Sequence, residues 1–204
     1  VLEEPPENAV LLLVTHQPSR ILPTIRSRCR TLSCGPLSPA DLQQAFEVVL
    51  PDHTFEPSLI ALAEGSVGQA AELALTEGVL AYGTIVNMCR SLPHFDRVKL
   101  LKLANSARGN TDGKFDQILN LLDIFIARLA RAAVSPASAY EAAPGENEVF
   151  SRLCPNQNAA HLWADTQLEL SQRARRGKIA NLDPSSLILD MGLRIEETAS
   201  KILR

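Results

Sequence analysis

Aromatic residues are scarce in this sequence, because only six Phe, two Tyr and one Trp stand among its 204 residues. So few rings argue against a stacking platform for single-stranded nucleic acid. The four cysteines form no C-x-x-C pair, which argues against a zinc ribbon and against a disulfide framework. No apolar run reaches the roughly 18 residues of a membrane span. We therefore expect no membrane segment.

Glycine-rich phosphate loops are also missing, since neither G-x-x-x-x-G-K-[ST] nor G-x-G-x-x-G occurs. This chain alone is therefore not expected to bind ATP in the P-loop manner. A large charge excess is missing too, because 20 Lys and Arg residues face 23 Asp and Glu residues. With 46% apolar residues and this charge balance, the chain can bury a core, which excludes disorder as its main state. We expect a soluble, cytosolic protein.

The charge distribution divides the chain into three segments. Residues 1–36 carry a net charge of +1, residues 37–92 a net charge of −6, and residues 93–204 a net charge of +2. Within the first segment, the stretch 20–30 holds four arginines and no acid. These contrasts predict three structural units with different roles.

The first segment has the pattern of a small part of an α/β domain. Residues 10–15 form an unbroken apolar run, which favours a strand covered on both faces, as in a parallel sheet. Residues 23–28 begin with Pro and are expected to form a short helix, and residues 29–32 a second brief strand. Two strands with one crossover cannot bury their own faces. We therefore interpret residues 1–36 as the end of a larger α/β domain.

The other two segments have helical patterns. In 37–92 we expect four short amphipathic helices, with Ser38 and Ser66 as N-terminal caps. In 93–204 the elements are longer, and the strongest stripe of apolar residues at three- and four-residue steps runs from Phe115 to Ala133. Residues 135–145 are expected to form a loop, and Asp183 to cap a last helix. The short connections predict antiparallel bundles.

The arginines of the first segment are the first candidate functional residues. Arg26 and Arg28 flank Ser27 at the end of the expected short helix, and no acid lies nearby in sequence to neutralise them. A guanidinium presents a planar set of donors that suits phosphate. On composition alone, a solvated basic edge explains the same residues equally well.

Other chemistry-bearing residues are weaker candidates. Thr15 ends the expected buried strand, where ligands of open α/β sheets bind, although a Thr that merely ends a strand is commoner. Cys29 has arginine neighbours that would favour a thiolate, but no base stands near it in sequence, so a half-buried structural role is preferred. His16 lacks partners at metal or triad spacing. A second basic patch at 173–178 stands at an expected helix C-terminus, where cations are favoured anyway.

Three motifs together resemble the bacterial DNA polymerase III clamp-loader ATPases, which are AAA+ proteins. They are Leu2-Glu3-Glu4-Pro5-Pro6, Leu11-Leu12-Leu13-Val14-Thr15, and Leu22-Pro23-Thr24-Ile25-Arg26-Ser27-Arg28-Cys29. The last contains the Ser-Arg-Cys motif of the family. Within the family the chain is most similar to the delta prime type of subunit, because Gly68 stands where the ATP-hydrolysing gamma/tau type carries a sensor Arg. The ending that starts at Asn181 also resembles that type.

The resemblance implies a mainly α fold with three parts. Residues 1–36 would be the C-terminal end of the RecA-like α/β domain, a remnant of its parallel sheet. Residues 37–92 would be the helical lid, and residues 93–204 a helical collar for oligomerisation. The phosphate loop, the Walker B region and a zinc module would precede this chain in a longer protein.

The resemblance also implies roles for single residues. Arg28 would be an arginine finger that acts in the ATP site of a neighbouring subunit. Ser27, Cys29 and Arg26 would support its placement, and Thr15 would correspond to sensor 1. No cofactor is expected in this chain, because ATP and Mg²⁺ would belong to neighbouring subunits.

The implied function is that of an accessory replication subunit without a complete active site of its own. It would belong to a DNA-directed DNA polymerase holoenzyme, which as a complex is a nucleotidyltransferase. Its partners would be the gamma/tau and delta subunits through the collar, with the sliding clamp and primed DNA engaged by the complex, in the bacterial cytoplasm. Two alternatives remain open at this point. One is a gamma/tau-like subunit that hydrolyses ATP itself, and the other is a helical interaction module with no link to nucleotide.

Overall fold

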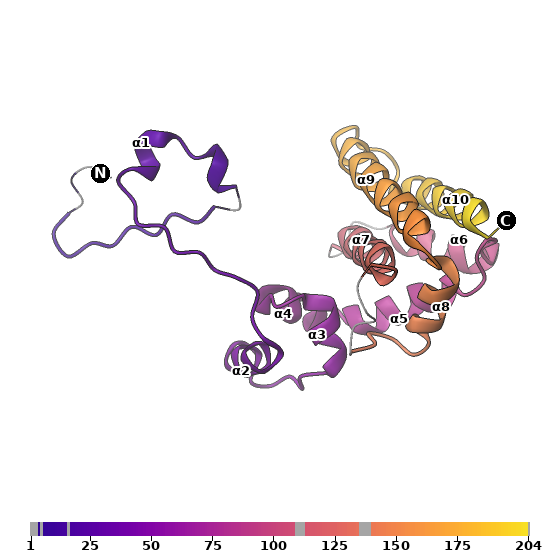
Figure 1. Ribbon diagram of the computed structural model, residues 1–204, viewed down its shortest axis with the longest axis horizontal. Helices are drawn as coiled ribbons and strands as arrows, with labels where there is room; N and C mark the ends of the chain where they lie inside the picture. Colours follow the sequence, from indigo (N-terminus) through magenta and orange to yellow (C-terminus); the bar gives the residue numbers. More distant parts are fainter. Residues whose placement is uncertain (1–3, 5, 16, 109–112, 135–139, 204) are drawn as a thin grey trace. The chain divides into compact units, whose positions relative to one another are not determined.

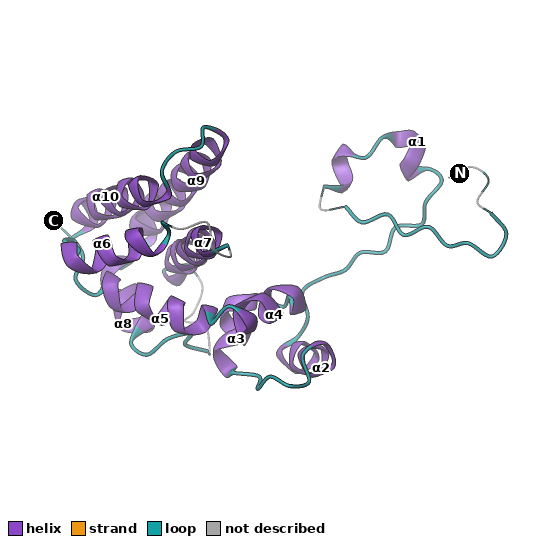
Figure 2. Ribbon diagram, turned by 180° about the vertical axis from the view of Figure 1, so that it is seen from behind, coloured by secondary structure: helices purple, strands orange, loops and turns teal. Residues whose placement is uncertain are grey.

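The computed structural model describes residues 4, 6–15, 17–108, 113–134 and 140–203. Across these residues the secondary structure is helical and no strand is present (Figure 1, Figure 2). The predicted mainly α fold is thus confirmed. The chain divides into two compact units, Val1–Pro36 and Leu37–Arg204.

The first unit contains one turn of 3₁₀-helix, η1 (Pro18–Arg20), and one short α-helix, α1 (Pro23–Arg26). Both begin with Pro, whose fixed φ suits the first helical position. None of the described residues of this unit is buried.

The two strands predicted for this unit are absent from its described residues. Residues 10–15 and 29–32 have no regular secondary structure, and Leu12 is 87% exposed. The physical reason is that a strand exists only through hydrogen bonds to a neighbouring strand, and the described part of the unit supplies none. The remnant of a parallel sheet therefore stays an inference from the resemblance.

The second unit consists of nine helices in its described residues. They are α2 (Pro39–Val49), α3 (Pro57–Ala63), α4 (Val67–Leu75), α5 (Gly78–Cys89), α6 (Arg97–Ser106), α7 (Lys114–Ala132), α8 (Glu146–Leu153), α9 (Gln157–Ile179) and α10 (Pro184–Ile202).

Side-chain caps define several helix starts, as the sequence predicts. Ser38 accepts a hydrogen bond from the Asp41 amide at the start of α2, and Ser66 accepts one from Gln69 at the start of α4. Asp183 caps α10 in the same way. Each cap satisfies an amide that has no partner within the helix. For the helix with the strongest apolar stripe, the sequence offers Thr111 or Asp112 as the first residue, and both lie outside the described residues. In the structure, α7 begins at Lys114.

The core of the second unit joins both helical segments of the sequence. Helix α4 packs on α2, on α3 and on α5, and α5 packs on α7. Helix α7 then packs along α9, and α10 packs against both α9 and α6 (Figure 1). Large side chains that are completely buried include Tyr82, Phe125 and Trp163. Because residues 37–204 form one compact unit, the division into a lid and a collar stays a prediction.

The structure also bears on membrane insertion. Over the described ranges, no helix combines the length and the apolar character that crossing a bilayer requires.

Candidate functional site

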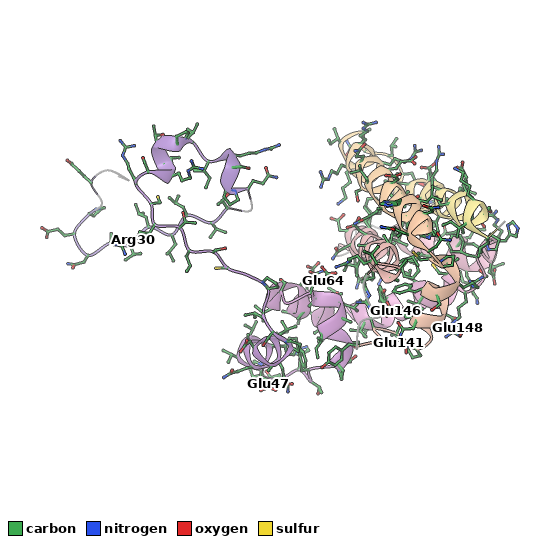
Figure 3. All side chains as sticks on the ribbon, viewed as in Figure 1. Arg30, Glu47, Glu64, Glu141, Glu146 and Glu148 are labelled. Carbon is green, nitrogen blue, oxygen red and sulfur yellow. The ribbon has the colours of Figure 1, made fainter. Side chains whose placement is uncertain are left out.

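The arginine-rich stretch surrounds the short helix α1. Arg26 is the last residue of α1, Arg28 lies in the following turn, and Arg20 ends η1. All three side chains are exposed, as is that of Arg30, which Figure 3 labels in this unit. The structure therefore presents this basic stretch to the solvent.

Arg28 is oriented by the end of α1. Its Nη1 atom donates a hydrogen bond to the backbone oxygen of Thr24 at 2.8 Å, and the hydroxyl of Ser27 donates to the same oxygen at 3.0 Å. The amide of Arg28 bonds instead to the backbone oxygen of Ile25. The last carbonyls of a helix lack partners within it, so side chains that follow the helix can satisfy them. Ser27 and Arg28 are thereby tied to one carbonyl.

The other predicted site residues of the first unit lie in separate local arrangements. The hydroxyl of Thr15, which is exposed, accepts a hydrogen bond from the amide of Gln17 at 3.1 Å. This is a local turn contact of the kind Ser and Thr make in loops. Cys29 is half-buried, as the sequence predicts, and Cys34 is exposed. His16 lies outside the described residues.

Metal chemistry finds no support in the geometry that is described. Within those residues, no group of three or more His, Cys, Asp or Glu side chains is placed to hold a metal ion. Two further cysteines, Cys89 and Cys154, are buried, and burial raises the pKa of both thiols. Both therefore stay protonated at neutral pH and are poor nucleophiles.

Gly68 lies in the first turn of α4 and is exposed. A Cβ atom built at this position would meet nothing within 4 Å. Packing in this unit therefore does not require glycine here, and a longer side chain would fit.

Sequence reasoning missed a buried ionic cluster in the second unit. The Glu146 side chain is fully buried and accepts hydrogen bonds from Tyr82, from the amide of Ala142 and from Arg128 (Figure 3 labels Glu146). Arg128 binds it in the bidentate manner, with Nε and Nη2 at 3.0 and 2.9 Å from the two carboxylate oxygens. Its Nη1 atom donates to the backbone oxygen of Ala61, at 2.8 Å.

The electrostatics of this cluster indicate a structural role. Burial, followed by the charge of Glu146, raises the pKa of Tyr82 far above its ordinary value. Burial alone would lower the pKa of Arg128, but the hydrogen bond and charge of Glu146 outweigh it and raise that pKa. The phenol and the guanidinium thus keep their protons. Each buried side-chain nitrogen and oxygen of the cluster has a hydrogen-bond partner. No local signal reveals this cluster, because its members are far apart in the sequence.

Comparison with known proteins relates the chain to one group of replication proteins. Residues 1–38 match the family model described as "DNA polymerase III, delta subunit". The DNA polymerase III subunit delta' of Pseudomonas aeruginosa is 46% identical over 67 residues, which cover 32% of this chain and 20% of that relative. The subunit delta' of Bacillus subtilis is 40% identical over 76 residues, 36% of this chain and 22% of that relative. No solved structure matches the chain.

The chain is similar to DNA polymerase III delta' subunits. This similarity confirms the resemblance drawn from the motifs. The chain matches only about a fifth of the length of these delta' relatives. The segment that matches the family model contains Ser27, Arg28 and Cys29. The candidate site around Arg28 therefore lies within the segment that matches the family model.

Proposed function

We propose that the chain is part of a delta'-type subunit of the bacterial clamp loader, and that Arg28 acts as an arginine finger for a neighbouring subunit. The observation that supports this most directly is the placement of Arg28. It is exposed in the turn after α1, within the segment that matches the family model. An arginine that serves another subunit has to be exposed in this way.

The chemistry of the proposed step is charge stabilisation. A guanidinium contributed from a partner stabilises the negative charge that develops on a phosphoryl group during transfer. For GTPases such a finger is worth about 10³–10⁵ in rate. In this proposal ATP and Mg²⁺ belong to the site of the neighbouring gamma/tau subunit. Hydrolysis there then depends on assembly, because the neighbour's site is incomplete without this chain.

The residues around Arg28 have supporting roles in the proposal. Ser27 shares the Thr24 carbonyl with Arg28, which limits the directions that the guanidinium can take. Arg26 adds positive charge beside it, and half-buried Cys29, which follows Arg28, is proposed to support its placement. Thr15 is proposed as sensor 1, at the end of the apolar run that we infer to be a strand in the complete α/β domain.

The decisive experiment replaces Arg28 in the full-length subunit, assembled with gamma/tau and delta. We expect Arg28→Ala and Arg28→Lys to assemble normally and to lower DNA-stimulated ATP hydrolysis. Only the ATP site of the neighbouring subunit that faces Arg28 would be affected. The total rate of ATP hydrolysis should therefore fall by the fraction that this site contributes. Arg20→Ala is the matched control, because it removes an exposed arginine of the same stretch. It should leave the rate unchanged.

Two results would count against the finger. An unaltered rate with Arg28→Ala would leave the chain as a helical interaction module. Equal losses with Arg28→Ala and Arg20→Ala would indicate a general electrostatic effect of the basic stretch. A gamma/tau-like role would be supported instead if the full-length subunit alone hydrolysed ATP.

The second part of the proposal concerns assembly. Residues 93–204 would act as the collar that binds gamma/tau and delta, in a cytoplasmic complex that loads the sliding clamp onto primed DNA. Large apolar side chains stay exposed on the outer helices, among them Val98 on α6, Leu168 on α9 and Leu193 on α10. Such side chains are available for helix packing between subunits. Size-exclusion chromatography of the chain with gamma/tau tests this, and the absence of a complex would contradict it.

A further inference from the structure

An elongated groove lies between α5, α6 and α7, and the proposed function does not use it. Its volume is about 510 Å³. Its accessible apolar surface comes mainly from exposed Leu80 and partly buried Leu103, above a floor of core side chains that are at most 5% exposed, namely Ile85, Met88, Ile118 and Leu121. The lining residues from α5 and its N-cap extend from Glu77 to Met88, which corresponds to about 16 Å of helix at 1.5 Å per residue. The groove is therefore about three helical turns long.

Positive charge surrounds this apolar surface. Lys99 and Lys102 on α6 and Lys114 at the start of α7 line the groove, against a single acid, Glu77. Lys99 and Lys102 are exposed, and neither has an ion-pair partner among the residues that the structure describes. Lys114 is oriented, because its Nζ atom donates to Oε1 of Gln117 at 2.8 Å.

A second, smaller cavity between α7 and α9 provides an internal comparison. Its volume is about 260 Å³, and its lining contains Asp116 and Asp123 as well as Arg175 and Lys178. There the charges are balanced, and Lys178 pairs with Asp116. Only the larger groove combines an apolar floor with an excess of lysines.

We propose that this groove binds an acidic amphipathic helix of a partner protein. An amphipathic helix places apolar side chains at three- and four-residue steps into such a groove. Carboxylates on its flanks would then meet Lys99, Lys102 and Lys114, which favours acidic partners over basic ones and speeds their association. The length of the groove suits about ten residues of helix, whereas a compact ligand would fill only part of it. Exposed polar groups at the edge, such as the amide of Asn87, are available for hydrogen bonds.

The test uses random peptides about four helical turns long, displayed on phage and selected against the purified chain. We expect the enriched peptides to carry Leu, Ile or Phe at helical spacing with Asp or Glu beside them. Synthetic copies are then titrated by fluorescence anisotropy. Lys99→Glu/Lys102→Glu should weaken binding about tenfold at low salt, and the difference should shrink as salt is added. Leu80→Asp should weaken it as well, and should fold, because Leu80 is 70% exposed.

Two further variants sharpen the test. Glu77→Lys removes the one acid of the groove and should tighten binding about two- to threefold. Arg175→Glu/Arg176→Glu changes the net charge as much as the double lysine variant does, but on exposed residues of α9 outside the groove. It should leave peptide binding within a factor of two of the unaltered chain.

Several outcomes would overturn the proposal. Enriched peptides that are basic, or that bind equally to the groove variants and the control, would show that the groove is not the site. Self-association of the chain that Lys99→Glu/Lys102→Glu abolishes, measured by sedimentation, would assign the groove to a second copy. Binding to anionic phosphatidylglycerol vesicles through the same lysines, with no peptide enriched, would assign it to a lipid surface.

Discussion

Residues 1–36 and residues 37–204 both contain many large apolar side chains, but they place them in opposite ways. In the first unit, Val10, Leu12 and Val14 are each more than 80% exposed, and none of its described residues is buried. In the second, each of the helices α2 to α10 contributes side chains to one continuous core. The second unit therefore contains what it needs to stabilise its own fold.

The exposed apolar side chains of the first unit indicate contacts that its described residues do not make. Monomeric proteins rarely leave a contiguous row of large aliphatic side chains in water. The apolar run at 10–15 therefore calls for a covering element, which the inferred parallel sheet of a complete α/β domain would provide. By contrast, polar groups in the second unit are well satisfied: among the residues described, no buried side-chain nitrogen or oxygen lacks a hydrogen bond.

The largest loss of stability is expected when the side chain of Arg128 is removed from the second unit. Arg128→Ala leaves the fully buried carboxylate of Glu146 without its bidentate partner, so the free energy of unfolding should fall by about 3–5 kcal/mol. Arg131→Ala is the control one turn later, because its pair with Glu64 is exposed on both sides. That change should cost less than about 1 kcal/mol. Urea titrations that gave equal losses would refute the structural role of the cluster.

Moderate changes in stability, of opposite sign, are expected when Gly83 and Gly78 of α5 are replaced by alanine. Gly83 lies in the middle of α5, where a Cβ atom would make an ordinary contact of 3.9 Å with Ala143. Gly83→Ala should therefore raise the free energy of unfolding by about 0.5–1 kcal/mol. At Gly78 a Cβ atom would lie 3.0 Å from the Cα of Leu73, so Gly78→Ala should be destabilising. Thermal unfolding of the two variants distinguishes these signs, and a shared sign would contradict the packing described.

A smaller effect, which depends on pH, is expected at the start of α10. Hydrogen bonds from Ser186, with a contribution from Arg108, lower the pKa of Asp183. A lowered pKa in the folded state means that the stabilisation is present above the pKa of the unfolded chain and disappears as pH falls through that of the folded state. The melting temperature of Asp183→Ala should thus lie below that of the unaltered chain at pH 7, with a gap that narrows in acid.

Asp183→Asn is the matched variant, since Asn can still cap a helix but does not ionise in this range. Its melting temperature should exceed that of Asp183→Ala at pH 7. A gap between the unaltered chain and Asp183→Ala that widened in acid would exclude this account.

The smallest effect is expected in the first unit. Leu12→Asp replaces a side chain that is 87% exposed, so the stability of the chain should change by less than about 0.5 kcal/mol. In the full-length delta'-type subunit that we propose, where residues 10–15 are inferred to form a buried strand, the same substitution should be strongly destabilising. Equal melting temperatures of the altered and unaltered full-length subunits would argue against the inferred sheet.

Helices were predictable from the sequence where local chemistry specifies them. Ser38, Ser66 and Asp183 mark helix starts because a cap acts within three residues of its own position. The strand prediction at residues 10–15 was wrong for the structure described, since pairing depends on a neighbour that local sequence does not supply. The exposed position of Arg28 follows from its charge, whereas its bond to Thr24 required coordinates.

The buried cluster and the groove were beyond the reach of sequence patterns. Tyr82 and Glu146 are 64 residues apart, and Arg128 reaches Ala61 across 67 residues. Contacts at such separations follow from how helices pack, and periodicity reports only which face of a helix is apolar. In the same way, Lys99 and Lys114 look like ordinary solvated lysines until α6 and α7 place them on one groove.

The guanidinium of Arg128 has a mechanical consequence. It holds the last turn of α3 through the Ala61 carbonyl and the first turn of α8 through Glu146, while its own backbone belongs to α7. A pull on α3 would thus be transmitted to α8 through one rigid, planar group. A rearrangement that separated α3 from α7 would first have to break the hydrogen bond between the Arg128 guanidinium and the Ala61 carbonyl, while the ion pair with Glu146 would keep α7 and α8 together.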